Sequence, residues 1–175
     1  MALNMPFSYD PTNGSNSENV LDFSGGGTDG VYPGSTANPT AIAASSGNCQ
    51  VGDCMSFDGG DYVGLGDSLE DVFVGEDQQF GFSVWVKPAA AMTANFIIAK
   101  LGDTSCSENQ REYFLRLGTG SFPEFLWYGN LANTSYRGVR ASTTAITNTT
   151  HCYHVARTYD GTIDTNNGLD RVNIF

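Results

Sequence analysis

Short stretches that alternate apolar and polar residues recur along the chain and predict strands rather than helices. In QFGFSVWVKP, residues 79–88, every second position from Phe80 to Val86 is apolar, which is typical of a strand with one buried face. Pro88 ends this strand. Similar segments are CMSFD (54–58), DYVGL (61–65), NFIIAKL (95–101), REYFLRLG (111–118), EFLWYG (124–129), CYHVARTYDG (152–161) and RVNIF (171–175).

The stretch MSFDGGDYVGLGDS, residues 55–68, predicts a tight hairpin. Its apolar arms, 55–57 and 63–65, are separated by Asp58-Gly59-Gly60-Asp61. Asp-Gly and Gly-Gly steps supply the positive φ angles that such turns require.

Residues 1–50 are rich in Gly, Ser, Asn, Thr and Pro, and they predict irregular chain with two short strands near 20–23 and 31–32. Only SLEDVF (68–73) and AAAMTA (89–94) have the composition for a turn of helix. Many short strands separated by turns predict an all-β fold, an antiparallel β-sandwich, and the lack of intervening helices excludes parallel βαβ units. We expect one domain over 1–175, with 1–19 as an irregular N-terminal segment.

Composition supports this fold class and narrows the partners. The 175 residues include 21 Gly, 11 Phe and 8 Tyr, a content that favours strands and tight turns. Nineteen acidic residues against eight basic ones give a net charge of −11, which repels phosphate backbones and anionic membranes. We therefore expect no nucleic-acid binding. No apolar run approaches the ~20 residues of a membrane-spanning helix, so we expect no membrane insertion.

The four cysteines form an even set without the CxxC spacing of zinc sites. Three disulfide pairings are open, and four reduced thiols in a cytosolic protein are the alternative. We favour Cys49 with Cys54, which flank a turn, and Cys106 with Cys152, which would tie a polar loop to a strand.

Six segments in order carry a resemblance to a known family: SFDGGDYVGL, QQFGFSVWVKP, FIIAKLGD, EYFLRLG, CYHVARTYDG and RVNIF. Together with LDFSGGGTDGVYPG upstream, they resemble the concanavalin A-like, laminin-G-like jelly roll over about residues 20–175. The chain departs from the family pattern around Cys152 and Tyr153, where a Trp is usual.

The resemblance also implies further strands beyond Phe175. We therefore expect the C-terminal end to be truncated within the domain. An unpaired sheet edge exposes backbone donors and acceptors, so we expect this edge to be capped, with homodimerisation through it as the first hypothesis.

The sequence lacks the arrangements that common hydrolases use. Glucanases of this fold carry Glu-x-Asp-x-x-Glu on one strand face, and neither this spacing nor GxSxG or HExxH occurs. His151 and His154 would lie on opposite faces of a strand and cannot grip a metal together. His154 is expected to be a hydrogen-bonded structural residue. We expect no enzymatic activity.

Calcium is the expected cofactor, because the chain is rich in carboxylates, Asn and glycine-rich turns. The spacing of Asp58, Asp61 and Asp67 excludes a contiguous EF-hand loop. The resemblance instead implies a site made by Asp22, Asp29 and Asp58. A second candidate, Asp103, Glu108 and Asn109, is implied by resemblance to related pentraxin-type sandwiches, which bind calcium from this position. The alternative for each is a carboxylate that accepts backbone N–H bonds in an Asx-turn.

A carbohydrate site needs aromatic faces and polar side chains, and EFLWYGNLANTSYRG offers both. We expect Trp85 and Trp127 to pack in the core, with Tyr136 and Arg137 on the surface. The candidate ligand-binding residues are Trp127, Tyr128, Asn130, Tyr136 and Arg137.

We therefore expect the chain to be a secreted or cell-surface, non-catalytic binding module, with a glycan or an extracellular protein as its partner. Two alternatives stay open: an adhesive or structural protein–protein module, and a fragment of a polysaccharide-degrading enzyme.

Overall fold

The computed structural model describes the chain in segments, which belong to two compact units. The described residues are 19–20, 24, 26–32, 39–66, 79–90, 95–100, 113–128, 136–141, 145–159 and 173–174. The first unit is Met1–Val72 and the second is Phe73–Phe175. Each is described by itself, and the expectation of a single domain stays a prediction.

The first unit contains two small antiparallel ladders. Strand β1 (Asn19–Val20) pairs with β2 (Gly30–Val31), and β3 (Thr40–Ile42) pairs with β4 (Cys54–Ser56). The 3₁₀ helix η1 (Ala44–Ser46) lies in the connection between β3 and β4. A disulfide between Cys49 and Cys54 closes the end of this connection.

The predicted hairpin around residues 58–61 is wrong, although the turn itself is present. Strand β4 pairs with β3, and Gly64 forms an isolated bridge with Val31 instead of pairing with β4. Gly59 has φ of +101°, as the Asp-Gly sequence predicts. The two apolar arms therefore leave the turn toward different partners: the first arm pairs with β3, and the second bridges to Val31 at the end of β2.

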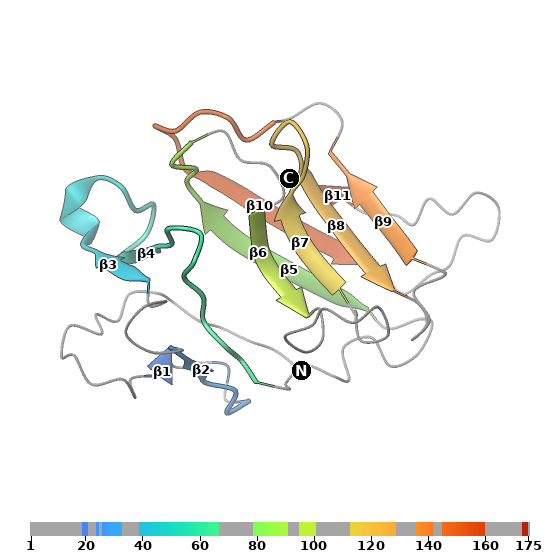
Figure 1. Cartoon of the computed structure of the whole chain (residues 1–175), viewed down its shortest axis with the longest axis horizontal. Coiled ribbons are helices and arrows are strands. Elements are labelled where there is room, and N and C mark those ends of the chain that lie inside the picture. The colour runs from blue at the N-terminus through green and yellow to red at the C-terminus, as the bar shows by residue number, and fades with distance from the viewer. Residues whose placement is uncertain are drawn as a thin grey trace. The chain divides into compact units, whose positions relative to one another are not determined.

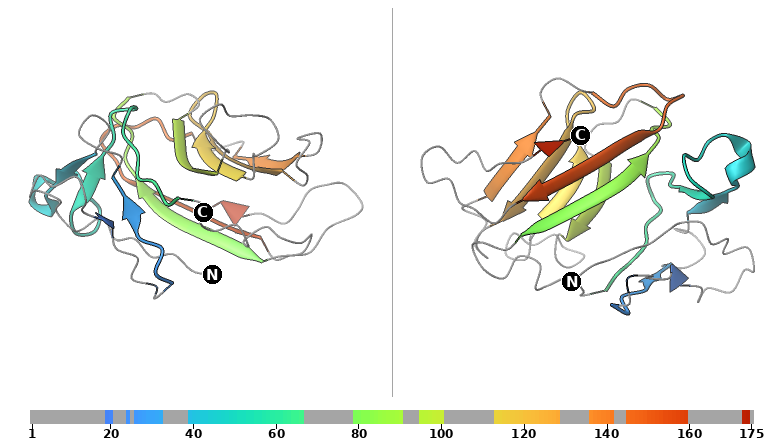
Figure 2. Two further views of the ribbon diagram at one scale, coloured as in Figure 1. Left: turned by 60° about the horizontal axis from the view of Figure 1, so that its bottom comes forward. Right: turned by 180° about the vertical axis from the view of Figure 1, so that it is seen from behind.

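The second unit is a sandwich of two antiparallel sheets (Figure 1). One sheet has the order β11-β10-β5 and the other has the order β6-β7-β8-β9. Seen from behind, β5 and β10 lie in front of the four-stranded sheet (Figure 2). The strands are β5 (Phe80–Val86), β6 (Asn95–Lys100), β7 (Tyr113–Leu117), β8 (Pro123–Tyr128), β9 (Tyr136–Arg140), β10 (Tyr153–Tyr159) and β11 (Asn173–Ile174).

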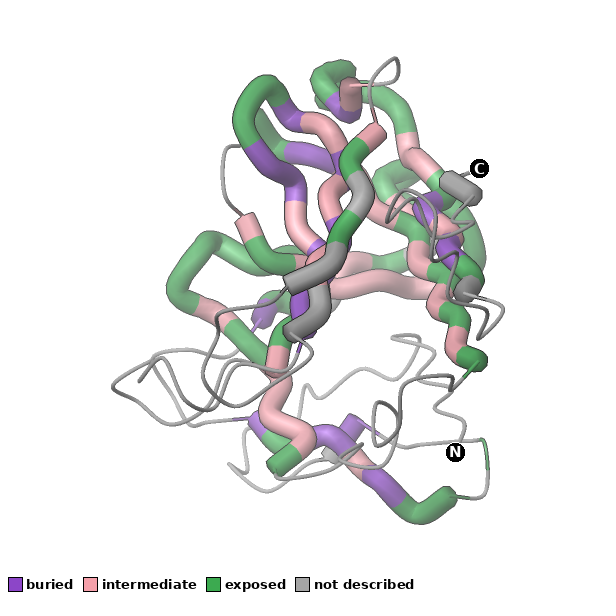
Figure 3. Tube along the Cα trace, turned by 90° about the vertical axis from the view of Figure 1, so that its right-hand side faces the viewer, coloured by how far each residue is buried: buried purple, intermediate pink, exposed green. Residues whose placement is uncertain are grey.

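The core of this unit lies between the two sheets. Phe125 of β8 is completely buried, and its ring lies 5.4 Å from that of Phe80 and 4.8 Å from that of Phe82 on β5. Arg157 of β10 is also buried, with its guanidinium carbon 4.6 Å from the centre of the Phe125 ring. Half-buried and exposed residues alternate along β5, whereas four of the five residues of β7 are buried (Figure 3). The remaining buried members of the cluster are Tyr113, Leu115, Leu117, Ile146 and Val155.

Strand β9 is absent from the sequence prediction, because two arginines and a glycine hide its pattern. It pairs with β8 from Glu124↔Arg140 to Tyr128↔Tyr136. A Cβ at Gly138 would lie 2.7 Å from Leu126 Cγ and from the Phe125 carbonyl oxygen, so only glycine fits this close approach. The predicted all-β antiparallel sandwich is nevertheless confirmed.

Candidate functional site

The predicted ligand residues of β8 and β9 are brought together by the strand register. Trp127 is the cross-strand partner of Arg137, and Tyr128 is the partner of Tyr136. Asn130 lies outside the described residues. The ladder thus places four of the five predicted residues side by side, and a ligand site at this end of the sheet stays a prediction.

Trp85 is on the surface, so the expectation that it packs in the core is wrong. Strand β5 alternates strictly, with Phe80, Phe82, Val84 and Val86 turned toward the core and the intervening positions exposed. Trp85 occupies one of these exposed positions and keeps 48% of its surface accessible. The period of the strand therefore decides its direction, and the size and apolarity of the indole do not.

The Trp85 ring lies against a fixed imidazole. His154 is its cross-strand partner on β10, and the two ring centroids are 4.8 Å apart with planes inclined by 31°. His154 Nε2 and Ser83 Oγ share a hydrogen bond of 2.6 Å, whose donor depends on the tautomer of the imidazole. The prediction that His154 is a hydrogen-bonded residue is confirmed. We call Ser83, Trp85 and His154 the tryptophan face.

The outward positions of β5 and β10 that flank the tryptophan face carry small, uncharged side chains. On β5 and β10 the outward positions that accompany the three residues are Gly81, Ala156 and Thr158, and Gly81 pairs with Thr158. None of these side chains is ionisable. The indole therefore borders small, uncharged side chains on the two strands, and Lys87 follows two residues after Trp85, beyond the end of β5.

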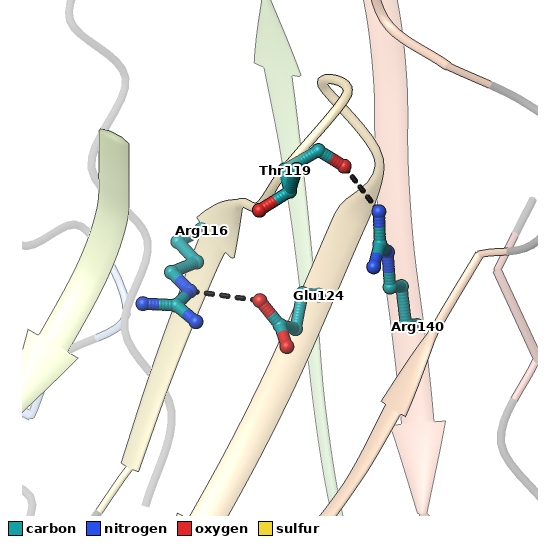
Figure 4. Close-up of polar contacts among 4 residues, drawn as sticks. All are labelled: Arg116, Thr119, Glu124 and Arg140. Carbon is teal, nitrogen blue, oxygen red and sulfur yellow. Dashed lines mark hydrogen bonds and ion pairs between the residues drawn. The ribbon is translucent and has the colours of Figure 1, made fainter. Parts of the chain in front are cut away.

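The four-stranded sheet presents a different outer face. A cross-strand row runs over all four strands, from Phe96 to Arg116, from Arg116 to Glu124, and from Glu124 to Arg140. Arg116 Nε donates to Glu124 Oε2 at 2.8 Å, and Arg140 Nη2 donates to the carbonyl oxygen of Thr119 (Figure 4). We call Phe96, Arg116, Glu124 and Arg140 the arginine row.

A β-bulge places the first member of the arginine row. The register of β6 against β7 shifts between Phe96 and Ile98, so that Ile97 and Ile98 both pack toward the core. Phe96 is left outside with 51% of its surface exposed. Its ring makes a T-shaped contact with Phe114, with centroids 5.4 Å apart.

The predicted calcium residues are only partly within the described chain. Asp22 lies outside it, as do Asp103, Glu108 and Asn109 of the second candidate. The carboxylate of Asp58 accepts the Gly60 N–H at 2.8 Å, and that of Asp61 accepts the Asp58 N–H at 2.8 Å. The contact of Asp58 with Gly60 is the Asx-turn that was the alternative to calcium at this residue. Asp29 is half-buried.

Within the described residues, no group of three or more His, Cys, Asp or Glu side chains is close enough to hold a metal ion. Because Asp22 is not among them, the proposed set of Asp22, Asp29 and Asp58 is not tested, and the calcium site stays a prediction.

The disulfide prediction is confirmed for one pair. Cys49 and Cys54 are bonded, with their Cα atoms 5.5 Å apart. Cys106 lies outside the described residues, so its pairing with Cys152 stays a prediction.

The functional candidates that sequence reasoning missed are Ser83, His154 and Trp85 as one surface unit. The sequence contained a signal for two of them. Apolar residues occupy every second position from Phe80 to Val86, and the residues between them, which include Ser83 and Trp85, are therefore expected to face outward. The arginine row had no comparable signal, since it depends on the register of four strands.

The architecture defines a lectin-like β-sandwich. The chain belongs to the concanavalin A-like lectin/glucanases superfamily, because a laminin-G family model of that description matches residues 57–168, more than half of the chain. The resemblance inferred from the sequence motifs is thereby confirmed. The match includes Asp58 and begins after Asp22 and Asp29. No curated protein and no solved structure matches the chain.

Proposed function

We propose that this chain is a non-catalytic carbohydrate-binding module and that the tryptophan face binds a neutral sugar. The observation that carries the proposal is the half-exposed indole of Trp85 on the outer side of the sandwich. Large aromatic rings at accessible positions supply apolar contact area at a small cost in conformational entropy. Membership of a superfamily that includes lectins supports a sugar as the ligand class.

The neighbours of Trp85 suit a sugar ring better than a charged or elongated apolar ligand. A pyranose presents C–H groups on its faces and hydroxyl groups at its rim. The indole offers an apolar face to the former, while Ser83, His154 and Thr158 offer donors and acceptors to the latter. Small-molecule sites typically combine an apolar surface with a few placed polar groups in this way.

His154 and Ser83 act as positioning residues in this proposal. The hydrogen bond to Ser83 restricts the imidazole, and the imidazole in turn supports one side of the Trp85 ring. An aromatic side chain that is already held in its binding orientation loses less conformational freedom when the ligand arrives.

Ser83 Oγ and His154 Nε2 are also at the hydrogen-bond distance that joins a catalytic serine to its base. In serine hydrolases, a third group accepts a hydrogen bond from the other imidazole nitrogen and orients the ring. Of the described residues, none forms a second hydrogen bond with His154. We therefore assign the pair to ligand positioning.

The described carboxylate of the second unit is engaged in an ion pair. Glycoside hydrolysis uses two carboxyl groups across the scissile bond. Among the described residues of the second unit, Glu124 is the one carboxylate, and it is bonded to Arg116.

An extracellular location is part of the proposal and rests on the Cys49–Cys54 disulfide, since disulfides persist in oxidising compartments. In the described part of the chain, no helix is long and apolar enough to cross a membrane.

Affinity measurements on neutral polysaccharides and their oligosaccharides test the proposal. Trp85→Ala is expected to weaken binding of the recognised sugar at least about tenfold, as for aromatic hot spots. Tyr62→Ala is the matched control, because Tyr62 is an aromatic residue of similar exposure, 55%, in the first unit. Absence of binding to any neutral saccharide on a glycan array, or an equal loss in both variants, would contradict the proposal.

A further inference from the structure

Arg116 on the outer face of the four-stranded sheet is held in place on several sides. Its guanidinium carbon lies 4.7 Å from the centre of the Phe114 ring and 6.0 Å from that of Phe96. Its Nε donates to Glu124 at 2.8 Å. Stacking on an aromatic face and a charge-assisted hydrogen bond together fix the plane of the guanidinium group.

This arrangement uses only one of the donor positions of Arg116. Glu124 contacts Nε, whereas Nη1 and Nη2 form no hydrogen bond with any residue in the described segments. The side chain is 29% exposed. Neither terminal nitrogen is among the buried, unpartnered polar atoms of the described residues, so both can be reached from solvent. Two parallel N–H groups in a fixed plane match the two oxygens of a carboxylate.

Glycine at position 118 makes room for the carboxylate of Glu124. A Cβ on Gly118 would lie 2.6 Å from Glu124 Oε2, which is closer than real Cβ contacts. Gly118 lies in the connection between β7 and β8, so this connection helps to place the Glu124 carboxylate that orients Arg116. The contact between Glu124 and Arg116 is drawn in Figure 4.

An exposed apolar ring accompanies these donors. Phe96 is the cross-strand partner of Arg116 and is half exposed. A ligand whose carboxylate reached Nη1 and Nη2 would lay its body beside this ring. The site thus combines a bidentate anion donor with an apolar support.

We propose that Phe96 and Arg116 form a second ligand site, which binds a hexuronate residue of an acidic glycan through its carboxylate. The choice of a sugar rests on the proposed carbohydrate function, whereas the choice of a carboxylate rests on Arg116 alone. The local charge of Arg116, Glu124 and Arg140 is +1, in a chain whose net charge is −11. Binding depends on direct contact here, because the field of the whole chain repels anions.

The experiment titrates the isotope-labelled full chain with an oligosaccharide that contains glucuronate and, separately, with its neutral counterpart. The Arg116 Nε–H resonance and affinities from calorimetry are the readouts. Glucuronate is expected to shift this resonance, and Arg116→Gln is expected to weaken glucuronate binding about tenfold or more, as for hydrogen bonds to charged groups. Phe96→Ala is expected to weaken it severalfold.

Arg140→Gln is the matched control, since it removes the same charge from the same row, two strands away from Arg116. An equal loss in Arg116→Gln and Arg140→Gln would overturn the site in favour of general charge attraction. Equal affinity for an acidic peptide without sugar would overturn the hexuronate assignment. The wild-type resonance keeps the test decisive even where a variant fails to fold, because an unshifted Arg116 signal at saturation contradicts the proposal.

Failure of this inference and failure of the proposed function give different results. Neutral sugar that binds in a Trp85-dependent way, with no effect of glucuronate on Arg116, would overturn the second site alone. Glucuronate that shifts Arg116 while neutral sugars bind nowhere would overturn the function of the tryptophan face alone.

Discussion

The two outer faces of the sandwich are built by the same kind of strand pairing, yet they present opposite chemistries. On β5 and β10, the indole of Trp85 and the imidazole of His154 lie among the small, uncharged outward residues of the two strands. On the four-stranded sheet, Arg116 and Glu124 form a charged pair beside Phe96. Both faces place an exposed aromatic ring next to a fixed polar partner, and in our proposal this partner decides which ligand chemistry each face accepts.

The shared core provides the largest expected effect, because both faces depend on it. Phe125→Ala removes a completely buried ring that contacts Phe80, Phe82 and Arg157. We expect a loss of about 3–5 kcal/mol in the free energy of unfolding, measured by urea denaturation. A loss below about 1 kcal/mol would contradict the packing of the two sheets on this residue.

Replacing the exposed aromatic residue of each face by alanine tests whether the two faces bind their ligands independently. Trp85→Ala is expected to weaken neutral-sugar binding at least about tenfold and to leave glucuronate binding within about twofold. Phe96→Ala is expected to weaken glucuronate binding severalfold and to leave neutral-sugar binding within about twofold. Sites on separate surfaces with no shared partners are additive within a few tenths of a kcal/mol. Calorimetry on both single variants and the double variant measures this. A strong non-additive effect would show that the two faces form one site.

Salt distinguishes the polar partners of the two faces. A double-mutant cycle on Arg116 and Glu124 is expected to give about 0.5–1 kcal/mol, because both groups are partly exposed and screened. The coupling should shrink in 1 M salt. The corresponding cycle on Ser83 and His154 should show little salt dependence, because the serine hydroxyl carries no charge to screen. Equal salt sensitivity of both cycles would contradict the difference between the faces.

Calcium gives the smallest expected effect, and it concerns the first unit. If Asp22, Asp29 and Asp58 bind calcium, its addition raises the melting temperature relative to chelator by mass action. Asp58→Asn keeps an oxygen that can accept the Gly60 N–H and removes the charge, so it should abolish the calcium response and preserve the turn. A melting temperature unaffected by calcium in the wild type would leave Asp58 with a turn role alone.

Sequence patterns predicted the strands whose signal is local. The alternation from Phe80 to Val86 placed β5 and separated its inward from its outward residues, and Asp58-Gly59 marked a real turn. The same alternation also contained the direction of Trp85. The core assignment of this residue failed because it gave weight to the apolarity of the indole over the period of the strand.

The features that could not be predicted depend on long-range pairing. The arm of the turn that contains Gly64 bridges Val31, which no local pattern specifies. Strand β9 takes its place from its register with β8, and the arginine row requires that register together with the bulge at Phe96. Because a strand can pair in several registers of similar local preference, only the folded sheet selects one.

A single titration tests the central claim that the sandwich has two distinct ligand faces. The labelled chain is titrated with neutral oligosaccharide and then with its glucuronate-containing counterpart, and the Trp85 indole N–H and the Arg116 Nε–H signals are followed. We predict that neutral sugar shifts the Trp85 signal alone and that glucuronate additionally shifts the Arg116 signal. Movement of both signals with the neutral sugar, or of neither with both ligands, would contradict the account.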